Sequence, residues 1–129
     1  MTNSDSRTKL ERLLQSYVDY GTYSFEGFTR IEVNSVGKEL ETPLHMLVTQ
    51  KDVEGVKLLI EAGANVNART DIGSTPLQSA VIGGNLEIIR MLLAAGADPE
   101  LASNFGQTAA SLAEHKPNRD EVLVLLRKH

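Results

Sequence analysis

The sequence of 129 residues contains no cysteine and no tryptophan, and aromatic residues make up only 5% of it. Without cysteine there is no disulfide, no thiolate metal site and no cysteine nucleophile. The longest uninterrupted apolar runs, 91–95 and 122–126, have five residues each, far short of the ~20 that span a bilayer. The polar N-terminus lacks the apolar stretch of a signal peptide. We therefore expect a soluble, cytoplasmic protein.

The sequence also has fewer basic than acidic residues. Thirteen Lys and Arg stand against seventeen Asp and Glu, a net charge of -4, which disfavours a nucleic-acid binder that relies on phosphate contacts. Residues 13–115 hold six basic and thirteen acidic side chains, a balance of -7, whereas both ends are mildly basic. The remaining composition is ordinary for a globular protein, and the length fits one domain.

A period of 33 residues runs through the sequence. Thr-Pro-Leu-His at 42–45 returns as Thr-Pro-Leu-Gln at 75–78 and, decayed, as Thr-Ala-Ala-Ser at 108–111. Glu-Ala-Gly-Ala-Asn at 61–65 returns as Ala-Ala-Gly-Ala-Asp at 94–98. Similarity at a fixed period of this length indicates stacked structural repeats.

The repeating unit has local signals for two helices. Thr before Pro predicts a helix start, because the Thr oxygen accepts from a free backbone N–H and Pro fits the first helical position. In the second copy this helix should end at the glycine pair 83–84, and Asn85 should cap a second helix that closes at Gly96. Each unit is therefore predicted to be helix, turn, helix and extended turn, which buries its apolar faces only by stacking.

The third copy is modified in ways that suit an end of the stack. Arg-Asp-Glu at 119–121 replaces Leu-Glu-Ile at 86–88, and charged side chains at these positions can face water. Pro117 should stop the preceding helix early.

The unit resembles the ankyrin repeat, whose consensus joins Gly-x-Thr-Pro-Leu-His, a glycine turn, a Leu-Leu helix and Gly-Ala-Asp-x-Asn. The second copy matches over 73–100, the first has Leu40 and Lys51 where glycine is usual, and the third keeps Gly106, Thr108 and its paired leucines. The resemblance implies an all-α repeat solenoid of stacked helix-turn-helix units with projecting β-turn fingertips. It divides residues 31–129 into 31–62, 63–95 and 96–129.

Residues 1–30 are predicted to form a divergent N-terminal cap, a degenerate first repeat. Apolar residues at helical spacing predict a helix from about Ser6 to Tyr20, and the link at 22–29 stands where a second helix would be. Five of the six aromatics fall in this segment: Tyr17, Tyr20, Tyr23, Phe25 and Phe28. They either cover the edge of the first full repeat or, Tyr20 and Tyr23 especially, bind a partner.

Motifs for catalysis are missing from the sequence. It has no phosphate-binding loop, no metal-ligand spacing and no nucleophile motif. The resemblance implies that His45 is structural and bonds across to the neighbouring turn. His115, expected at the open end of a short helix, and His129 have no partners at ligand spacing. A stack of short helices also offers no deep apolar cleft, so we expect no enzyme activity, no cofactor and no metal.

The resemblance implies that the fingertips and the exposed side of each first helix form a concave face that binds proteins. The fingertip positions are Lys38, Glu39, Glu41, Arg69, Asp71, Ile72, Ser74, Asn104, Phe105 and Gln107. The helix-side positions are Thr49, Gln50, Ile82, His115 and Lys116.

Ile72 and Phe105 break the polar pattern of these turns. They occupy the same fingertip position in adjacent repeats, and packed layers of helices lie about 10 Å apart, so the two side chains should be neighbours. They either anchor a partner or lean onto their own hairpins and are partly buried.

Two functions follow from these features. The first is a non-catalytic module that binds and masks a single protein partner with a basic surface, as an immunity protein does for a nuclease-type toxin. The alternative is a regulatory or assembly scaffold of a larger intracellular complex, with the aromatic segment and the concave face as separate interfaces. In both cases we expect a monomer when free, with no nucleic-acid or membrane partner.

Overall fold

The computed structural model describes residues 3–19 and 31–128. These residues form seven α-helices and no strand, which confirms the predicted all-helical repeat architecture. The helices are α1 (Asn3–Asp19), α2 (Pro43–Gln50), α3 (Val53–Glu61), α4 (Pro76–Gly83), α5 (Leu86–Ala94), α6 (Ala109–Ala113) and α7 (Arg119–Arg127).

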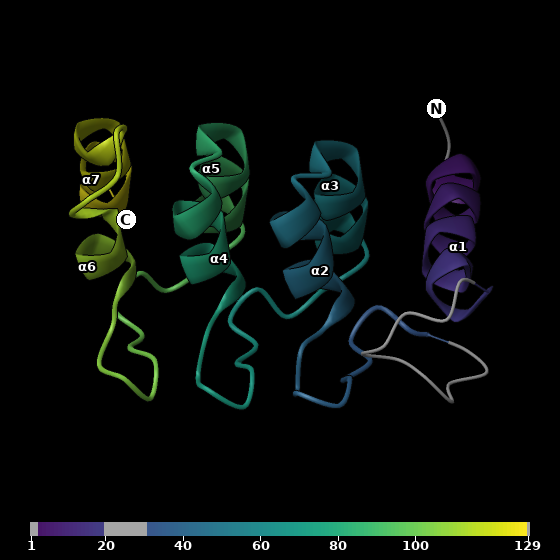
Figure 1. The fold of residues 1–129 in the computed structure, drawn as a ribbon. Coiled ribbons are helices and arrows are strands. Elements are labelled where there is room, and N and C mark those ends of the chain that lie inside the picture. The colour runs from purple at the N-terminus through teal and green to yellow at the C-terminus, as the bar shows by residue number, and fades with distance from the viewer. Residues whose placement is uncertain (1–2, 20–30, 129) are drawn as a thin grey trace.

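The helices stack in two rows (Figure 1). The first helices α2, α4 and α6 pack on one another, and the second helices α3, α5 and α7 form another row, drawn above them in this view. Long hairpin loops project from the same side of the stack before each first helix. A single apolar core runs through the layers, and Leu47, Leu59, Val81 and Ile89 in it are fully buried. Because each pair of helices packs on its neighbours, burial is continuous along the stack.

Each first helix begins at a threonine, as predicted. Thr42, Thr75 and Thr108 each accept a hydrogen bond from the backbone N–H three residues on, and the side chain of that residue accepts from the threonine N–H. This reciprocal arrangement satisfies two backbone donors that the helix leaves free. Pro43 and Pro76 occupy the first helical position, which confirms the second part of the prediction.

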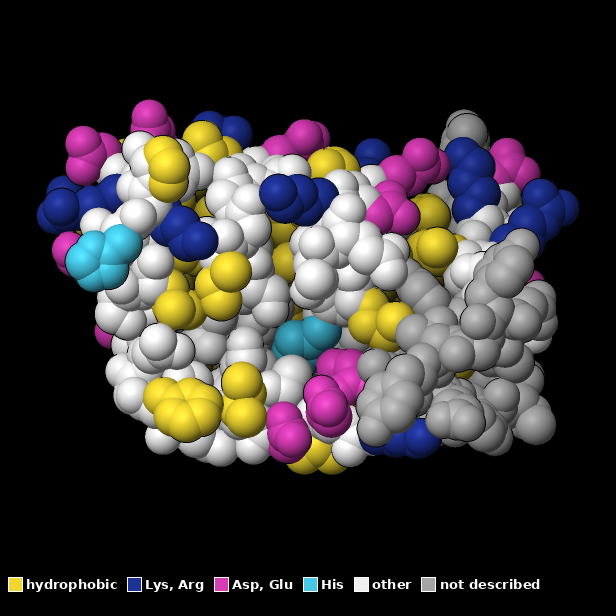
Figure 2. Space-filling view, viewed as in Figure 1, with side chains coloured by type: hydrophobic (Ala, Val, Ile, Leu, Met, Phe, Trp, Pro, Cys, Tyr) yellow, Lys and Arg dark blue, Asp and Glu magenta, His cyan; other side chains and the backbone are white. Residues whose placement is uncertain are grey.

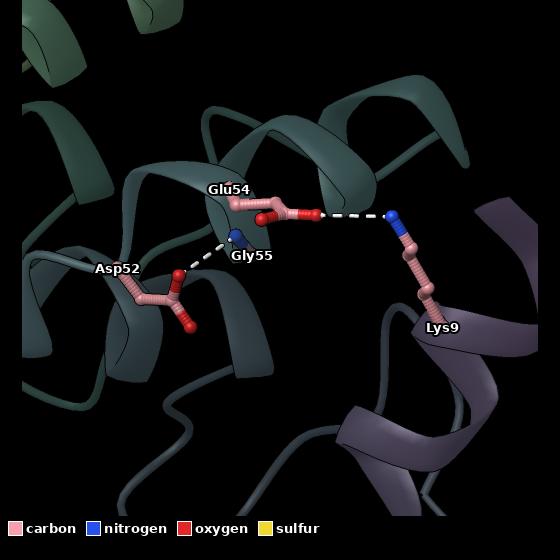
Figure 3. Close-up of polar contacts among 4 residues, drawn as sticks. All are labelled: Lys9, Asp52, Glu54 and Gly55. Carbon is pink, nitrogen blue, oxygen red and sulfur yellow. Dashed lines mark hydrogen bonds and ion pairs between the residues drawn. The ribbon is translucent and has the colours of Figure 1, made fainter.

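The turns between the helices also follow the prediction in the second pair. Gly84 ends α4 in the left-handed conformation, with φ 74°. The side chain of Asn85 then caps α5 by accepting from the Ile88 N–H at 3.0 Å. Asp52 caps α3 in the same way, with 2.9 Å between its Oδ1 and the Gly55 nitrogen (Figure 3).

The third pair departs from this pattern. Helix α6 has five residues where α2 and α4 have eight, because Pro117 keeps the residue before it out of the helical conformation and itself offers no N–H. His115 was expected at the open end of the short helix, and it lies in the turn just beyond the end of α6. Asn118 does not cap α7; its Nδ2 instead donates to the Gly84 carbonyl oxygen at 3.0 Å.

The N-terminal segment begins with the predicted amphipathic helix. Leu10 and Leu14 of α1 are buried in the common core. If residues 1–30 followed the order of helices in the other repeats, α1 would lie among the first helices. It instead packs against α3, in the row of second helices. Burial explains the difference, since packing against α3 places Leu10 beside Leu58 of that helix and removes apolar surface from water. The side chain of Tyr17 and residues 20–30, with the other four clustered aromatics, lie outside the described residues.

A lysine also links α1 to α3. The Lys9 Nζ lies 3.5 Å from a carboxylate oxygen of Glu54 (Figure 3). Both side chains are at least half exposed, so the pair adds little stability. The position of α1 therefore depends on the buried leucines.

Two residues hold glycine-like backbone geometry without being glycine. Leu40 has φ 63° and Lys51 has φ 60°, the only positive values among described residues other than glycine. Their equivalents one repeat later are Gly73 with φ 77° and Gly84 with φ 74°. The turns of the first repeat are therefore kept, and the side chains are held in a conformation that strains L-residues.

Replacing Lys51 with glycine should stabilise the protein. The left-handed conformation costs a side-chain-bearing residue about 1–2 kcal/mol, and the greater freedom of glycine in the unfolded chain offsets part of the gain. We expect Lys51→Gly to raise the free energy of unfolding by about 0.5–1 kcal/mol, measured by urea denaturation. Lys51→Ala, which removes the charge but keeps a Cβ, is the control. An equal gain in both variants would show that charge, not backbone strain, is responsible.

Candidate functional site

The predicted fingertips are tight β-turns at the ends of three hairpins. Within each hairpin one bond joins the two arms: Gly37 N–H to the Glu41 carbonyl at 2.8 Å, Thr70 N–H to Ser74 at 3.0 Å and Ser103 N–H to Gln107 at 2.8 Å. A second bond closes each turn over residues 37–40, 70–73 and 103–106. The turn residues are 38–39, 71–72 and 104–105, as expected from the repeat.

The tips of neighbouring hairpins are bonded to one another. The Asp71 N–H donates to the Glu39 carbonyl oxygen at 2.9 Å, and the Asn104 N–H donates to the Ile72 carbonyl oxygen at 2.9 Å. These bonds occur at equivalent positions 33 residues apart. The Asn104 side chain adds a bond from Nδ2 to the Asp71 carbonyl oxygen at 3.0 Å. The three tips therefore form one connected edge.

His45 fixes the base of the second hairpin. It is buried, and its Nδ1 accepts from the Thr42 N–H at 3.1 Å. The ring proton therefore belongs on Nε2, which donates to the Ser74 carbonyl oxygen at 3.0 Å. This geometry confirms that His45 bonds across to the neighbouring turn.

Gln78 repeats this connection one unit later. Its Oε1 accepts from the Thr75 N–H at 3.4 Å, while its Nε2 donates to the carbonyl oxygens of Leu101 and Gln107 at 2.9 and 3.1 Å. A neutral histidine and a glutamine therefore make equivalent bonds, with one acceptor toward the helix start and one donor toward the next hairpin.

A groove of about 400 Å³ lies between the first and second hairpins and the exposed side of α2. Seven of the fifteen predicted partner-binding residues line it: Glu39, Glu41, Thr49, Gln50, Asp71, Ile72 and Ser74. The other lining residues are His45, Met46, Thr70 and Ser79. Met46 is not among the predicted residues, although its spacing of three and four residues from Thr49 and Gln50 places it on the same helix face.

A family model described as ankyrin repeats, in three copies, matches residues 9–103. The chain belongs to the ankyrin repeat family. The match begins within α1 and stops before α6, yet α6 and α7 form a further helix pair on the same stack. Ankyrin repeats generally mediate protein–protein interaction and are typically not enzymes. A search of curated proteins found no match to this chain.

Two features are absent from the described part of the ankyrin stack. No helix in residues 3–19 and 31–128 has both the length and the apolar character to cross a membrane. Within the same part of the chain, no three His, Asp or Glu side chains gather as metal ligands would.

The groove of the ankyrin stack is lined by carboxylates. Glu39, Glu41 and Asp71 all line it, and no Lys or Arg of the described segments 3–19 and 31–128 does. One oxygen of Glu41 accepts from the Glu39 N–H at 3.1 Å. The other oxygen, Oε1, is buried without a hydrogen-bond partner among the described residues. Figure 2 shows acidic and hydrophobic side chains beside one another along the hairpin edge.

The two hydrophobic fingertip residues are exposed. Phe105 is 72% exposed and Ile72 is 47% exposed. Phe105 is therefore not buried against its own hairpin, and Ile72 is only half covered. The bond between the Ile72 carbonyl and the Asn104 N–H makes their turns direct neighbours.

The remaining predicted residues lie outside the groove. Lys38, Gln107 and His115 are exposed, Ile82 is 52% exposed at the end of α4, and Lys116 is partly buried in the turn after α6. Arg69 and Asn104 act within the stack. The Arg69 guanidinium donates to the carbonyl oxygens of Gly73 and Ala102, and so joins two hairpins.

His45 should make the fold sensitive to mild acid. Burial lowers the pKa of His45 from its ordinary value of 6.5, although the bond to Ser74 and the charge of Glu41 partly oppose this. Below pH 6.5 the unfolded chain therefore binds more protons at this residue than the folded protein does. The free energy of unfolding should fall as the pH drops from about 6.5 through the folded pKa.

Urea denaturation at about pH 7.5 and about pH 5.5 tests this expectation. His45→Gln should lose less stability between these pH values than the unsubstituted protein, because glutamine makes the same bonds without titrating. His45→Ala, the control that leaves both partners unbonded, should cost about 2 kcal/mol at the higher pH. Equal pH dependence in the unsubstituted and Gln proteins would refute a role for His45.

Proposed function

We propose that this ankyrin repeat protein is a non-catalytic module that binds a single protein partner through its concave face and acts by masking the surface it covers. The observation that carries the proposal is the exposure of Phe105 and Ile72 on adjacent, hydrogen-bonded fingertips. Aromatic and large aliphatic side chains held rigidly at a surface make strong interface anchors. The groove beside them offers polar contacts for the same partner.

The charge of the chain favours a partner with a basic surface. Residues 13–115 carry a balance of -7, and three carboxylates line the groove. Complementary charge accelerates association and excludes acidic competitors. The narrower form of the proposal is an immunity-type inhibitor that masks the basic surface of a toxin such as a nuclease. This narrower proposal requires that the rate of association with the partner fall as the salt concentration is raised.

A scaffold subunit of a larger complex is the second candidate. The observation in its favour is the clustering of five of the six aromatics in residues 17–28 of the sequence. Two separable interfaces would distinguish it from a masking protein. Substitutions at the fingertips would then abolish the binding of one partner and leave another partner bound.

The double substitution Ile72→Ser and Phe105→Ser should abolish partner binding without unfolding the protein. Both side chains are exposed, so stability should change by less than about 0.5 kcal/mol. Loss of two interface anchors should weaken binding at least about 30-fold. Circular dichroism and thermal melting measure the first effect, and affinity capture from the native host with mass spectrometry measures the second.

Val124→Ser is the matched control, because Val124 is 47% exposed on α7, away from the hairpins. It should capture the same partner as the unsubstituted protein. An unfolded double variant would show that the two fingertip residues are structural. Undiminished capture by a folded double variant would refute the proposed binding face.

A further inference from the structure

The carboxylates of the groove and the hydrophobic fingertips form one continuous edge. Glu39 and Asp71 are joined by a 2.9 Å backbone bond, and the same kind of bond joins Ile72 to the next tip. Asp71 and Ile72 are adjacent in sequence, and Ile72 itself lines the groove. An acidic groove therefore passes directly into an apolar surface that ends at Phe105.

Among the residues that the structure describes, no Lys or Arg lines the groove to balance its carboxylates. The backbone bond between the first two hairpins holds Glu39 and Asp71 at neighbouring tips, where like charges repel. Glu41 Oε1 is buried without a donor among the described residues. A carboxylate oxygen only accepts hydrogen bonds, so a positively charged donor that enters the groove would offset the repulsion between Glu39 and Asp71.

The wall of the groove also suits a long cationic side chain. Ile72 and Met46 line it alongside the carboxylates. Lys and Arg place their methylene stems on apolar surface while their charged ends bind acceptors. A small inorganic cation would make no use of these apolar walls.

We propose that the groove binds one Lys or Arg side chain of an extended protein segment, and that Ile72 and Phe105 bind an apolar side chain farther along that segment. Neighbouring layers lie about 8–10 Å apart, and an extended chain rises about 3.3 Å per residue. The two partner side chains are therefore about three residues apart. This inference rests on the proposed function and specifies the chemistry of the partner.

The test uses a synthetic peptide and the ¹⁵N-labelled full chain. The peptide is acetyl-Gly-Arg-Gly-Gly-Leu-Gly-amide, and its match has citrulline, a neutral isostere, in place of arginine. Titration with the arginine peptide should shift the amide NMR signals of Glu41, Asp71, Ile72 and Phe105. The citrulline peptide should bind at least about fivefold more weakly, as expected for the loss of the charge interactions.

Glu39→Gln with Asp71→Asn tests the groove from the protein side. The backbones of these residues, not their carboxylates, make the hairpin bonds, so the fold should be kept. This double variant should bind the arginine peptide about fivefold more weakly. Glu61→Gln with Glu87→Gln removes the same charge from exposed sites on α3 and the first turn of α5 and should bind it normally.

Three results would each overturn the inference. The two peptides could bind equally well, or both double variants could weaken binding equally. The NMR signals could also shift with protein concentration, because a second copy of the chain occupies the groove. These outcomes differ from failure of the proposed function. If a captured partner depends on Ile72 and Phe105 but not on Glu39 and Asp71, the face binds a protein and only its cationic specificity is wrong.

Discussion

The arrangement of helices and hairpins depends on one side chain in each full repeat that holds two elements at once. His45 accepts a backbone N–H at the start of its own helix and donates to the base of the next hairpin, and Gln78 does the same one layer later. Both side chains are buried, where an unpaired donor or acceptor is costly. The start of each first helix and the position of the following hairpin are therefore fixed together.

This coupling separates the residues that build the hairpin edge from those that we propose give it binding specificity. Once a hairpin base is fixed, backbone bonds join its tip to the next tip whatever side chains the tip residues carry. Glu39, Ile72 and Phe105 occupy equivalent positions, yet one is acidic and two are hydrophobic. An acidic groove can therefore lie beside an apolar surface while the backbone bonds between the tips are kept, and exposed tip residues contribute little to stability.

The sequence predicted the features that depend on local chemistry. Helix starts at Thr42 and Thr75, the cap at Asn85 and the turns at the fingertips follow from hydrogen bonding within a few residues. Features that depend on distant packing could not be predicted. The placement of α1 against α3 depends on which flank of the stack is uncovered, and the groove depends on how three separate segments meet. The bond of Asn118 to Gly84 replaces a local cap with a contact between layers.

Site-specific photo-crosslinking in the native host tests most directly whether a partner binds along the hairpin edge. p-Benzoyl-phenylalanine would replace Phe105 in one variant and Glu87, exposed in the row of second helices, in the other. The account predicts one dominant crosslinked partner from position 105 and little or none of it from position 87. Crosslinking of that partner from position 87 alone would contradict the account, because the binding surface would then lie on the opposite row of helices.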